Sequence, residues 1–540
     1  MTDFEAGLAA LRKIPAVAAV LKNASGPVYL VGGCLRDLLL GREVNDFDLA
    51  VWGDLEETAA RTASSLGVRA VPLGRAPAIV FRLIHQGLIV DVSPLEEPDI
   101  LADLLRRDLT INALALELTS ETDRAWIIDP VQGLKDLEEK RARFVSEQNL
   151  IKDPLRLLRL FRFAATLELS LAPDSLALVG KHALLINQTP GERIREELLK
   201  LLSVPGSHPL VTAMLEHGLL EALIPELTPL RGCGQNHYHH LDVLDHTLLA
   251  LKRLEEIMAA PEEYLPRYAP ELRRYLSQGH CPAWLKMALL WHDLGKPETR
   301  KVEDGGRTTF HRHEQLSEKL AGRLAARFRM SAAETALIRR LVRHHMRPFL
   351  LREARAGGHL TRRGVYRFGR DVGDDLWGLV VLSLADAAAA QGPAQEAQGG
   401  LEGLAVFFDH LLEELLAQKA KLIKMPRLLS GRDILNELGL EPSPEVGRIL
   451  AAIEEAQALG RVATRKEALI LARRVLRERA SGKTTAGLWP PWIGSGKASR
   501  PCLWSTRPNQ TGPSPRSSGP CSAWPTVFRT GWSWVWIHPY

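Results

Sequence analysis

The segment LVGGCLRDLLLGREVNDFDLAV, residues 30–51, places two glycines, an Arg-Asp pair and two aspartates within one short stretch. Buried charges must be paired or bound to a ligand, so neither a helix core nor a buried strand explains this combination. Asp46 and Asp48 are separated by one residue, and a strand places such residues on one face, with Phe47 and Leu49 on the other. The segment therefore predicts a strand whose two carboxylates are completed by a group from outside the protein.

Two carboxylates on one strand face can share divalent metal ions. Oxygen ligands suit Mg²⁺, and two such ions can activate an attacking hydroxyl while they stabilise a leaving pyrophosphate. Gly32 and Gly33 allow backbone N–H groups to approach a phosphate, and the helix expected to start near Cys34 or Leu35 adds its N-terminal dipole. Arg36 is expected to neutralise triphosphate charge. Each piece alone is also typical of an ordinary turn or strand end, but the joint arrangement is specific.

The last sixty residues differ in composition from the rest of the chain. They contain seven of the twelve tryptophans and nine of the thirty-three prolines, and they have no Asp or Glu. The net charge of +5 arises in this segment, because its six Lys and Arg residues have no acidic counterpart. We expect residues 481–540 to be a disordered or aberrant extension, and the working protein to end near Ala480.

Several classes of protein are disfavoured by the sequence. The first 23 residues mix charges in an amphipathic helical pattern, and no uncharged apolar stretch reaches the length of a membrane span. The five cysteines are scattered without CxxC spacing, which argues against a disulfide framework and a thiolate zinc site. We therefore expect a soluble, cytoplasmic protein, with no membrane association and no evident obligate protein partner.

The pattern of apolar residues changes along the chain. The first 140 residues alternate short strand-like runs with helical patterns, which predicts a small mixed α/β domain. From about Asn149 onward the apolar residues follow helical spacing, and we expect everything after that point to be helical.

Three motifs in the first domain resemble a known family. The pattern GG-x-x-RD-x-LLG followed by DFD resembles the signature of class II tRNA nucleotidyltransferases and bacterial poly(A) polymerases, a branch of the polymerase-β-like nucleotidyltransferases. RRDLTINALAL, residues 106–116, resembles the family motif that contacts the ribose and phosphates of the incoming nucleotide, and DPVQGLKDL, residues 129–137, is similar to its flexible-loop segment. Asp91 is a candidate third carboxylate, although a single Asp at a strand end is often structural. The resemblance implies nucleotide-binding roles for Arg106, Arg107, Asp108 and Asn112.

Residues 149–163, NLIKDPLRLLRLFRF, resemble the family's nucleobase-selecting helix, whose pattern is usually Glu-Asp-x-x-Arg. Asp153 and Arg156 match it, while Lys152 stands where Glu is usual. A carboxylate accepts hydrogen bonds and a guanidinium donates them, so the pair suits cytosine and adenine, which present an amino donor beside an acceptor ring nitrogen. UTP and GTP would leave site groups unpaired. Arg159 is expected to contact the nucleotide or RNA phosphates, and the alternative is an ordinary solvated helix face.

GERIREEL, residues 191–198, resembles the last family motif, ERxxxE. Its Glu192, Arg193 and Glu197 are spaced as expected for a network of charges that braces helices rather than for direct chemistry.

The later part of the chain contains, in this order, His246, His292, Asp293, His313, His345 and Asp386. These residues resemble the ordered ligands of an HD-type metal phosphohydrolase. Imidazole and carboxylate ligands suit Mn²⁺, Fe²⁺, Ni²⁺ or Mg²⁺. Such a domain could hydrolyse phosphoesters or cyclic phosphates, hold a metal structurally, or serve as a helical body that contacts RNA. His344 is an alternative to its neighbour His345. The resemblance implies that these six side chains are metal ligands.

The sequence therefore predicts an α+β polymerase-β-like nucleotidyltransferase head followed by all-α neck, HD and tail domains. The expected boundaries are 1–140 for the head, 141–230 for the neck, 231–395 for the HD domain and 396–480 for an RNA-binding tail. The implied activity is template-independent addition of CCA to tRNA from CTP and ATP, with Asp46 and Asp48 as catalytic Mg²⁺ ligands. The alternatives are a poly(A) polymerase, a CC-only or A-only enzyme, and, from a different class, an HD phosphohydrolase with an inactive head.

Overall fold

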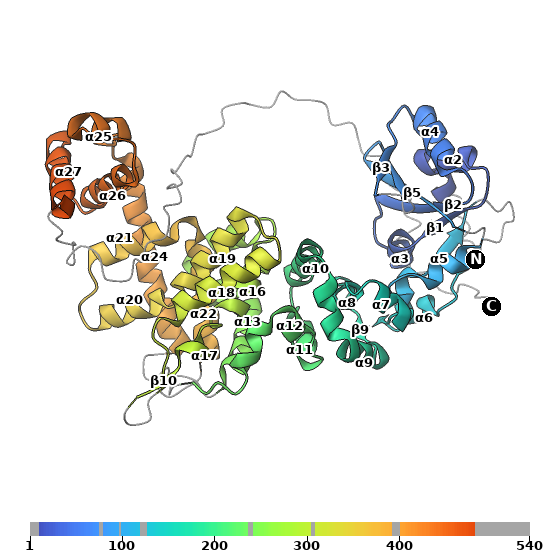
Figure 1. Cartoon of the computed structure of the whole chain (residues 1–540), viewed down its shortest axis with the longest axis horizontal. Helices are drawn as coiled ribbons and strands as arrows, with labels where there is room; N and C mark the ends of the chain where they lie inside the picture. The colour runs from blue at the N-terminus through green and yellow to red at the C-terminus, as the bar shows by residue number, and fades with distance from the viewer. Residues whose placement is uncertain are drawn as a thin grey trace. The chain divides into compact units, whose positions relative to one another are not determined.

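The computed structural model describes residues 10–74, 79–96, 99–118, 127–235, 241–303, 308–390 and 400–480. They form two compact units (Figure 1). The first unit contains the described residues up to 228 together with 324–330, and the second contains the described residues of 229–323 and from 331 onward. The extension expected at 481–540 lies outside the described residues. None of the described helices is long and apolar enough to cross a membrane.

A mixed sheet of seven strands organises the head, the N-terminal part of the first unit. β2 lies near its centre, parallel to β5 and antiparallel to β1. In the order of the sheet, the strands are β3 (Val71–Leu73), β4 (Val80–His85), β5 (Leu88–Pro94), β2 (Asp46–Val51), β1 (Val28–Val31), β6 (Ala115–Glu117) and β7 (Ile127–Ile128).

Alternation along β2 separates its apolar residues from its carboxylates. Phe47 and Leu49 have no exposed surface and belong to the core, whereas Asp46 and Asp48 occupy the alternate positions and therefore lie on the other face. Further along that second face, Ala50 packs in a cluster of buried apolar residues that includes Tyr29 and Leu104. The predicted division of this strand into two faces is confirmed.

Helices flank the sheet of the head. α2 packs against α4, and α4 contacts β4 and β5. α4 begins after Asp54, whose carboxylate accepts a hydrogen bond from the N–H of Glu57 and so caps the helix. The helices and turns of this part are α2 (Pro15–Asn23), α3 (Gly33–Leu39), α4 (Leu55–Leu66), α5 (Ile100–Leu105), η1 (Thr110–Asn112) and α6 (Gly133–Glu138).

The neck follows the head within the first unit, and its helices begin with a break. The segment resembling a single nucleobase-selecting helix is divided between α7 and α8, with Asp153, Pro154 and Leu155 between them. Pro154 disfavours helical geometry at the preceding residue, and Asp153 has φ −136° and ψ 90°. The neck contains α7 (Glu147–Lys152), α8 (Arg156–Leu167), α9 (Pro173–His182), η2 (Ala183–Gln188), α10 (Gly191–Ser203), α11 (His208–Glu216), α12 (Leu219–Leu223) and η3 (Pro225–Leu230).

Helices dominate the second unit, and α22 lies at its centre with nearly every residue buried. α22 packs against α13, α16, α19 and α24. The main helices are α13 (Val243–Ala259), α14 (Pro261–Tyr264), α15 (Ala269–Leu276), α16 (Cys281–Trp291), α17 (Lys296–Thr299), α18 (His313–Arg327), α19 (Ala332–His344), α20 (Arg347–Ala356), α21 (Arg362–Val372) and α22 (Leu376–Ala389). Single turns η4 (Pro266–Tyr268) and η5 (Gly373–Asp375) link some of them.

The C-terminal part of the second unit begins with the long helix α24 (Gly400–Lys424). Three further helices, α25 (Gly431–Leu438), α26 (Pro444–Ala458) and α27 (Arg465–Ala480), enclose a small core of their own that includes Ile434, Ile449 and Ala468. Three guanidinium groups of α21 surround the buried carboxylate of Glu455 and join this part to the preceding helices.

An α+β head followed by a mainly helical remainder agrees with the predicted fold class. The expectation of helices alone after Asn149 was too strict, because short strands β9 (Ser170–Leu171), β10 (Lys301–Val302) and β11 (Thr308–Thr309) lie beyond it. β9 pairs with β8 (Arg141–Ala142), and β10 pairs with β11. Strands of two residues have no detectable alternation, since period-two patterning needs a longer run.

Candidate active site and metal centre

Three carboxylates meet on one face of the head sheet. Asp48 lies beside Asp91 in the parallel register of β2 and β5, and Asp46 is two residues before Asp48. One oxygen from each of the three lies within 4.8 Å of the others. The structure thus brings the two predicted metal ligands together with the candidate third carboxylate, and this set of oxygen donors fits a divalent cation of the Mg²⁺ type.

Arg82 is a charged neighbour of this site that the sequence analysis missed. Its guanidinium donates two hydrogen bonds to Asp91, from Nε at 2.8 Å and from Nη2 at 2.7 Å. Gln86 and Gly87 both have positive φ, as a two-residue hairpin turn requires, and counting back from this turn places Arg82 opposite Asp91. The QG dipeptide between two apolar runs was the signal from which the pair could have been predicted.

Crowding of negative charge changes the acidity of the carboxylates. Burial and the charge of Asp46 raise the pKa of Asp48 to about 6, although Arg107 acts in the opposite direction. Burial and the charge of Asp91 also raise the pKa of Asp46. A bound divalent cation would relieve this repulsion, so the electrostatics of the site favour a cation.

The glycine turn after β1 lies beside these carboxylates. Gly32 has φ 73°, and a Cβ at this position would lie 2.5 Å from Nη1 of Arg107 and 3.7 Å from Oδ2 of Asp48. Only glycine allows the backbone this conformation and this close approach. Gly33 begins α3, and Cys34 accepts a hydrogen bond from the N–H of Asp48 through its Sγ at 3.3 Å. The predicted phosphate cradle is therefore adjacent to the predicted metal ligands.

Arg36 is buried rather than open to solvent. Its Nε and Nη2 donate to Asp37 at 2.9 and 2.8 Å, and its Nη1 donates to Oδ1 of Asn112 at 2.6 Å. Its guanidinium also lies 5.0 Å from the ring centroid of Phe163. A contact with a triphosphate, the role expected from the sequence, would require some of these bonds to break.

The Arg-Arg-Asp motif at the end of α5 presents its three side chains differently. Arg106 is exposed and pairs with Glu96. Arg107 donates to Asp103 and to the backbone carbonyl of Asn112. Asp108 is buried, and although burial raises its pKa, the nearby Arg159 and a hydrogen bond from Asn112 lower it by more. Arg106 and Arg107 are therefore the accessible cations of the motif.

The two residues predicted to read the base have separate partners. Arg156 donates from Nη1 to the carbonyl of Arg107 at 2.9 Å and from Nη2 to the carbonyl of Arg106 at 2.7 Å. Asp153 accepts hydrogen bonds from Arg193 of α10 at 3.1 and 3.3 Å. Because two bonds use only two of its five N–H groups, Arg156 keeps donors for another ligand.

Charged residues of the GERIREEL motif hold α8 and α10 together. Glu197 forms an ion pair of 2.6 Å with Arg162 of α8, and Arg193 bonds to Asp153, which precedes that helix. Arg159 forms an ion pair of 2.7 Å with Asp108. The contacts of Glu197 and Arg193 join the α8 segment to α10, as expected for bracing residues, whereas the Arg159 pair joins α8 to the head.

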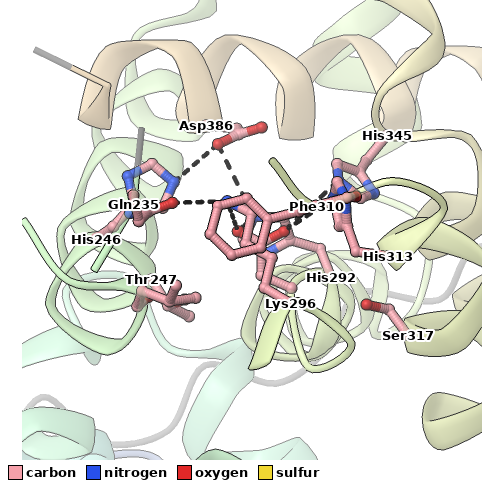
Figure 2. Close-up of polar contacts among 12 residues, drawn as sticks. Gln235, His246, Thr247, His292, Lys296, Phe310, His313, Ser317, His345 and Asp386 are labelled. Atoms are coloured by element: carbon pink, nitrogen blue, oxygen red, sulfur yellow. Dashed lines mark hydrogen bonds and ion pairs between the residues drawn. The ribbon is translucent and has the colours of Figure 1, made fainter. Parts of the chain in front are cut away.

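The second unit holds a cluster of buried imidazoles and carboxylates (Figure 2). His246 lies 2.9 Å from Asp386, and His292 lies 3.1 Å from Asp293. His313 lies 3.3 Å from the other oxygen of Asp293. Three overlapping sets of possible ligands result: His246, His292 and Asp293; His292, His345 and Asp386; and Asp293, His313 and His345.

Backbone carbonyls fix the orientation of three of the imidazoles. Nδ1 of His292, His313 and His345 lies 2.6 to 2.8 Å from the carbonyl oxygen three residues earlier in each case. A hydrogen bond from Nδ1–H leaves Nε2 as the ligand atom, and these Nε2 atoms face the carboxylates. These hydrogen bonds to backbone carbonyls are the orienting contacts that metal-binding histidines usually have.

Electrostatics within the cluster also fit a metal centre. Burial lowers the pKa of His292, but Asp293 and Asp386 outweigh burial and raise it to about 10. Burial, together with His292 and His313, lowers the pKa of His345 to about 3 and keeps it neutral. Within the described part of the chain, Nε2 of His292 and both carboxylate oxygens of Asp293 have ion-pair contacts but no hydrogen bond of normal geometry. These buried polar atoms, arranged around a shared centre, fit one or more divalent cations.

Two polar residues beside the cluster were not identified from the sequence. Lys296 forms an ion pair of 2.6 Å with Asp293 and donates a hydrogen bond of 2.7 Å to Gln235. The sequence HDLGK contained the lysine, but only the turn after α16 places it against the carboxylate. His344 does not belong to any of the possible ligand sets found among the described residues, so the geometry favours His345 as the ligand.

Four family models match successive parts of the chain. They are the poly A polymerase head domain at residues 28–143, the "Probable RNA and SrmB- binding site of polymerase A" at 168–230, the HD domain at 243–391, and tRNA nucleotidyltransferase domain 2 at 413–472. Their order follows the order of the predicted head, neck, HD domain and tail.

Curated relatives match most of the chain. The A-adding tRNA nucleotidyltransferase of Deinococcus radiodurans is 34% identical over 445 residues, which cover 81% of this chain and 93% of the relative. The CC-adding tRNA nucleotidyltransferase of Thermus thermophilus is 34% identical over 450 residues, which cover 82% of this chain and 92% of the relative. The multifunctional CCA protein of Teredinibacter turnerae is 33% identical over 332 residues, which cover 55% of this chain and 70% of the relative.

Solved structures show the same fold. A CCA-adding enzyme in its apo form I has a TM-score of 0.56 and 19% identity, and the match covers 86% of this chain and 92% of that one. The Thermotoga maritima CCA-adding enzyme, solved with tRNA, has a TM-score of 0.51 and 20% identity, and the match covers 83% of this chain and 91% of that one.

Proposed function

The chain belongs to the family of tRNA nucleotidyltransferases with an HD domain and is an RNA nucleotidyltransferase. We propose that it adds C, C and A in sequence to the 3′ end of tRNA. CTP and ATP are the proposed substrates and pyrophosphate the second product. The single observation that carries the proposal is the cluster of three carboxylates beside the glycine turn. The same proposal places the enzyme in the cytoplasm, where tRNA is used.

Asp46 and Asp48 would hold Mg²⁺, with Asp91 as the neighbouring third carboxylate. When bound, the ions supply the charge that activates the 3′-hydroxyl and stabilises the leaving pyrophosphate. The chain itself would hold the triphosphate through the backbone around Gly32 and through Arg107, whose guanidinium lies over that glycine. Positioning of the hydroxyl in line with the α-phosphate accounts for most of what the protein contributes.

Base selection is proposed for Asp153 and Arg156. Arg193 holds the carboxylate of Asp153, and two backbone carbonyls hold the guanidinium of Arg156. The carboxylate accepts from the exocyclic amino group of cytosine or adenine, and the guanidinium donates to the adjacent ring nitrogen. Uracil and guanine would place an acceptor against Asp153 and a donor against Arg156, so they would be rejected.

The test uses tRNA transcripts that end before CCA, after C, or after CC. Each is incubated with purified enzyme, Mg²⁺ and one nucleotide, or with CTP and ATP together, and products are sized at single-nucleotide resolution. Three additions that require CTP and then ATP would support the proposal. A long ATP-only ladder on unrelated RNA would identify a poly(A) polymerase instead.

A partial enzyme is the second candidate. Two relatives that match over four fifths of this chain are named A-adding and CC-adding, whereas the multifunctional CCA protein of Teredinibacter turnerae matches 55% of it. The same transcripts separate the possibilities. Arrest after CC would indicate a CC-adding enzyme, and extension only of transcripts that end in CC would indicate an A-adding enzyme.

The buried cluster of the second unit supports a phosphohydrolase activity beside nucleotide addition. Two of its three possible ligand sets contain Asp293, and Lys296 supplies a cation at the same carboxylate. Such a centre would use Mn²⁺, Ni²⁺, Fe²⁺ or Mg²⁺ to polarise a phosphoester. Release of phosphate from 2′,3′-cyclic and 3′-terminal phosphates by the wild-type enzyme, and its loss in Asp293→Asn, would support this activity; equal release by both proteins would exclude it.

A further inference from the structure

The ring of Phe163 in α8 is surrounded by three guanidinium groups. The central guanidinium carbons of Arg36, Arg159 and Arg162 lie 5.0, 5.6 and 3.5 Å from the ring centroid. The side chain is buried, with 6% of its surface exposed. Arg36 comes from the head, while the other two arginines lie on the same helix as the ring. One aromatic side chain therefore contacts cations from both parts of the first unit.

Each guanidinium is also paired with a carboxylate from a different sequence motif. The partner of Arg36 follows the glycine turn, the partner of Arg159 ends the Arg-Arg-Asp motif, and the partner of Arg162 ends the ERxxxE motif. The three ion pairs are Arg36 with Asp37 at 2.8 Å, Arg159 with Asp108 at 2.7 Å and Arg162 with Glu197 at 2.6 Å. Phe163 is the side chain at which these three motifs meet.

The physical role of the ring follows from its charge distribution. Three like charges held close together repel one another, and this repulsion is strong where water is scarce. The negative face of an aromatic ring attracts each cation, so Phe163 offsets part of the repulsion. An aliphatic side chain of similar volume would fill the space without this attraction.

The position of the ring affects both sides of the proposed nucleotide site. Arg36 donates to Asn112, and Asn112 donates to Asp108, which binds Arg159 of α8. α8 begins at Arg156, two helical turns before Phe163, so the two side chains lie on the same face of the helix. A shift of the ring would move the start of α8 relative to the glycine turn.

We infer that Phe163 is a positioning residue that sets the base-selecting pair, Asp153 and Arg156, at its working distance from the catalytic carboxylates. This inference rests on the proposed base selection. It assigns Phe163 no contact with the nucleotide, because the ring is enclosed by guanidinium groups. Its contribution is to hold α8 in one orientation, and the consequence is selection of CTP and ATP over UTP and GTP.

The experiment compares Phe163→Leu with Phe161→Leu in the full-length protein. Phe161 lies on the same helix and has no exposed surface, and in the described part of the chain no guanidinium lies over its ring. For each variant, kcat and KM are measured for CTP and ATP, and incorporation of UTP is measured against CTP. Thermal unfolding of the same samples reports the loss of core packing.

We expect Phe163→Leu to raise KM for CTP and ATP by about tenfold and UTP incorporation relative to CTP by about tenfold. Phe163→Tyr, which keeps the aromatic face, should stay within about twofold of wild type. Phe161→Leu should lower the thermal midpoint and leave KM and selectivity at wild-type values, because a core residue acts on stability alone.

Equal KM and selectivity in Phe163→Leu and Phe161→Leu would overturn the inference. Should Phe163→Leu fail to fold, Phe163→Met provides the same comparison with a more adaptable side chain, and failure of both to fold would show a core role and also overturn it. A wild-type enzyme that used all four nucleotides equally would instead refute the proposed base selection before any variant is compared.

Discussion

The carboxylate site of the head and the cluster of the second unit both fit divalent cations, but they are built differently. The head offers three carboxylates, of which Asp46 is exposed and Asp48 and Asp91 are half-buried. The cluster offers four imidazoles and two carboxylates, all buried, and three of the imidazoles are oriented by backbone carbonyls. One site is open and short of ligands, whereas the other is enclosed and nearly complete.

The difference predicts how each site would use a metal ion. An open site with few protein ligands leaves coordination positions for substrate phosphates and water, as nucleotidyl transfer requires. An enclosed site with six candidate protein ligands would hold a metal between turnovers and contribute to folding. We therefore expect the head to bind metal together with nucleotide, and the cluster to retain metal without substrate.

Removal of a head carboxylate should have the largest effect on activity. Asp48→Asn should lower the rate of nucleotide addition by about a thousandfold or more, because the variant loses a ligand charge at the reacting phosphate. Extension of a tRNA transcript measured in single-turnover conditions tests this. Asp54→Asn is the matched control, since Asn still caps α4 and Asp54 lies outside the site. Comparable rates for the two variants would contradict the assignment.

Loss of the shared ligand in the cluster should affect metal content and stability rather than addition. Asp293→Asn should abolish metal retention and reduce the free energy of unfolding by about 3–5 kcal/mol, because His292 and Lys296 lose a buried counter-charge. Mass spectrometry of the dialysed protein and denaturant unfolding measure both. Asp374→Asn, at a side chain that is 87% exposed, is the control. Retention of the metal ion by Asp293→Asn would contradict the assignment of Asp293 as a metal ligand.

Removal of the base-reading carboxylate should change selectivity more than rate. Asp153→Ala should reduce the preference for CTP over UTP by about 10- to 100-fold, because the amino group of cytosine loses its acceptor. Competition between the two nucleotides on one transcript measures the ratio. Asp174→Ala, at the first turn of α9, is the control in the same part of the molecule. An unchanged ratio in Asp153→Ala would assign base selection to other residues.

The smallest expected effect concerns the stability of the metal-free head. The pKa of Asp48 is raised from 3.8 to about 6 in the folded protein, so its contribution to stability is fully present below pH 3.8 and lost as the pH rises through 6. The neutral Asp48→Asn should therefore be more stable than wild type by about 1–2 kcal/mol at pH 8, with a smaller difference near pH 4. Urea unfolding in chelator at both pH values tests the sign, and a constant difference would contradict it.

Local spacing made much of the head predictable. The i and i+2 positions of Asp46 and Asp48 determine a shared face once β2 is a strand, and Gly32 is required by the conformation of the turn. The pairing of Arg82 with Asp91 depends instead on the register of two strands. Burial of Arg36 could not be predicted from the sequence, because an arginine side chain can contact either a phosphate or a buried amide. Here it packs against Phe163 and donates a hydrogen bond to Asn112.

The cluster was predictable for a different reason. Its six residues are scattered over about 140 positions and have no common local spacing, so only their order in a family resemblance identified them. The support from backbone carbonyls arises because each oriented imidazole bonds to the residue three positions earlier, at the end of a helix or turn. Lys296 and Gln235 were missed because their contact joins residues 61 positions apart.

We expect the two sites to have separate roles, with nucleotide addition confined to the head. The most direct test is extension of a tRNA transcript lacking CCA by wild type, Asp48→Asn and Asp293→Asn side by side, with Mg²⁺, CTP and ATP. We expect stepwise addition by wild type and by folded Asp293→Asn, and none by Asp48→Asn. Addition by Asp48→Asn at the wild-type rate, or its loss in Asp293→Asn alone, would contradict the claim.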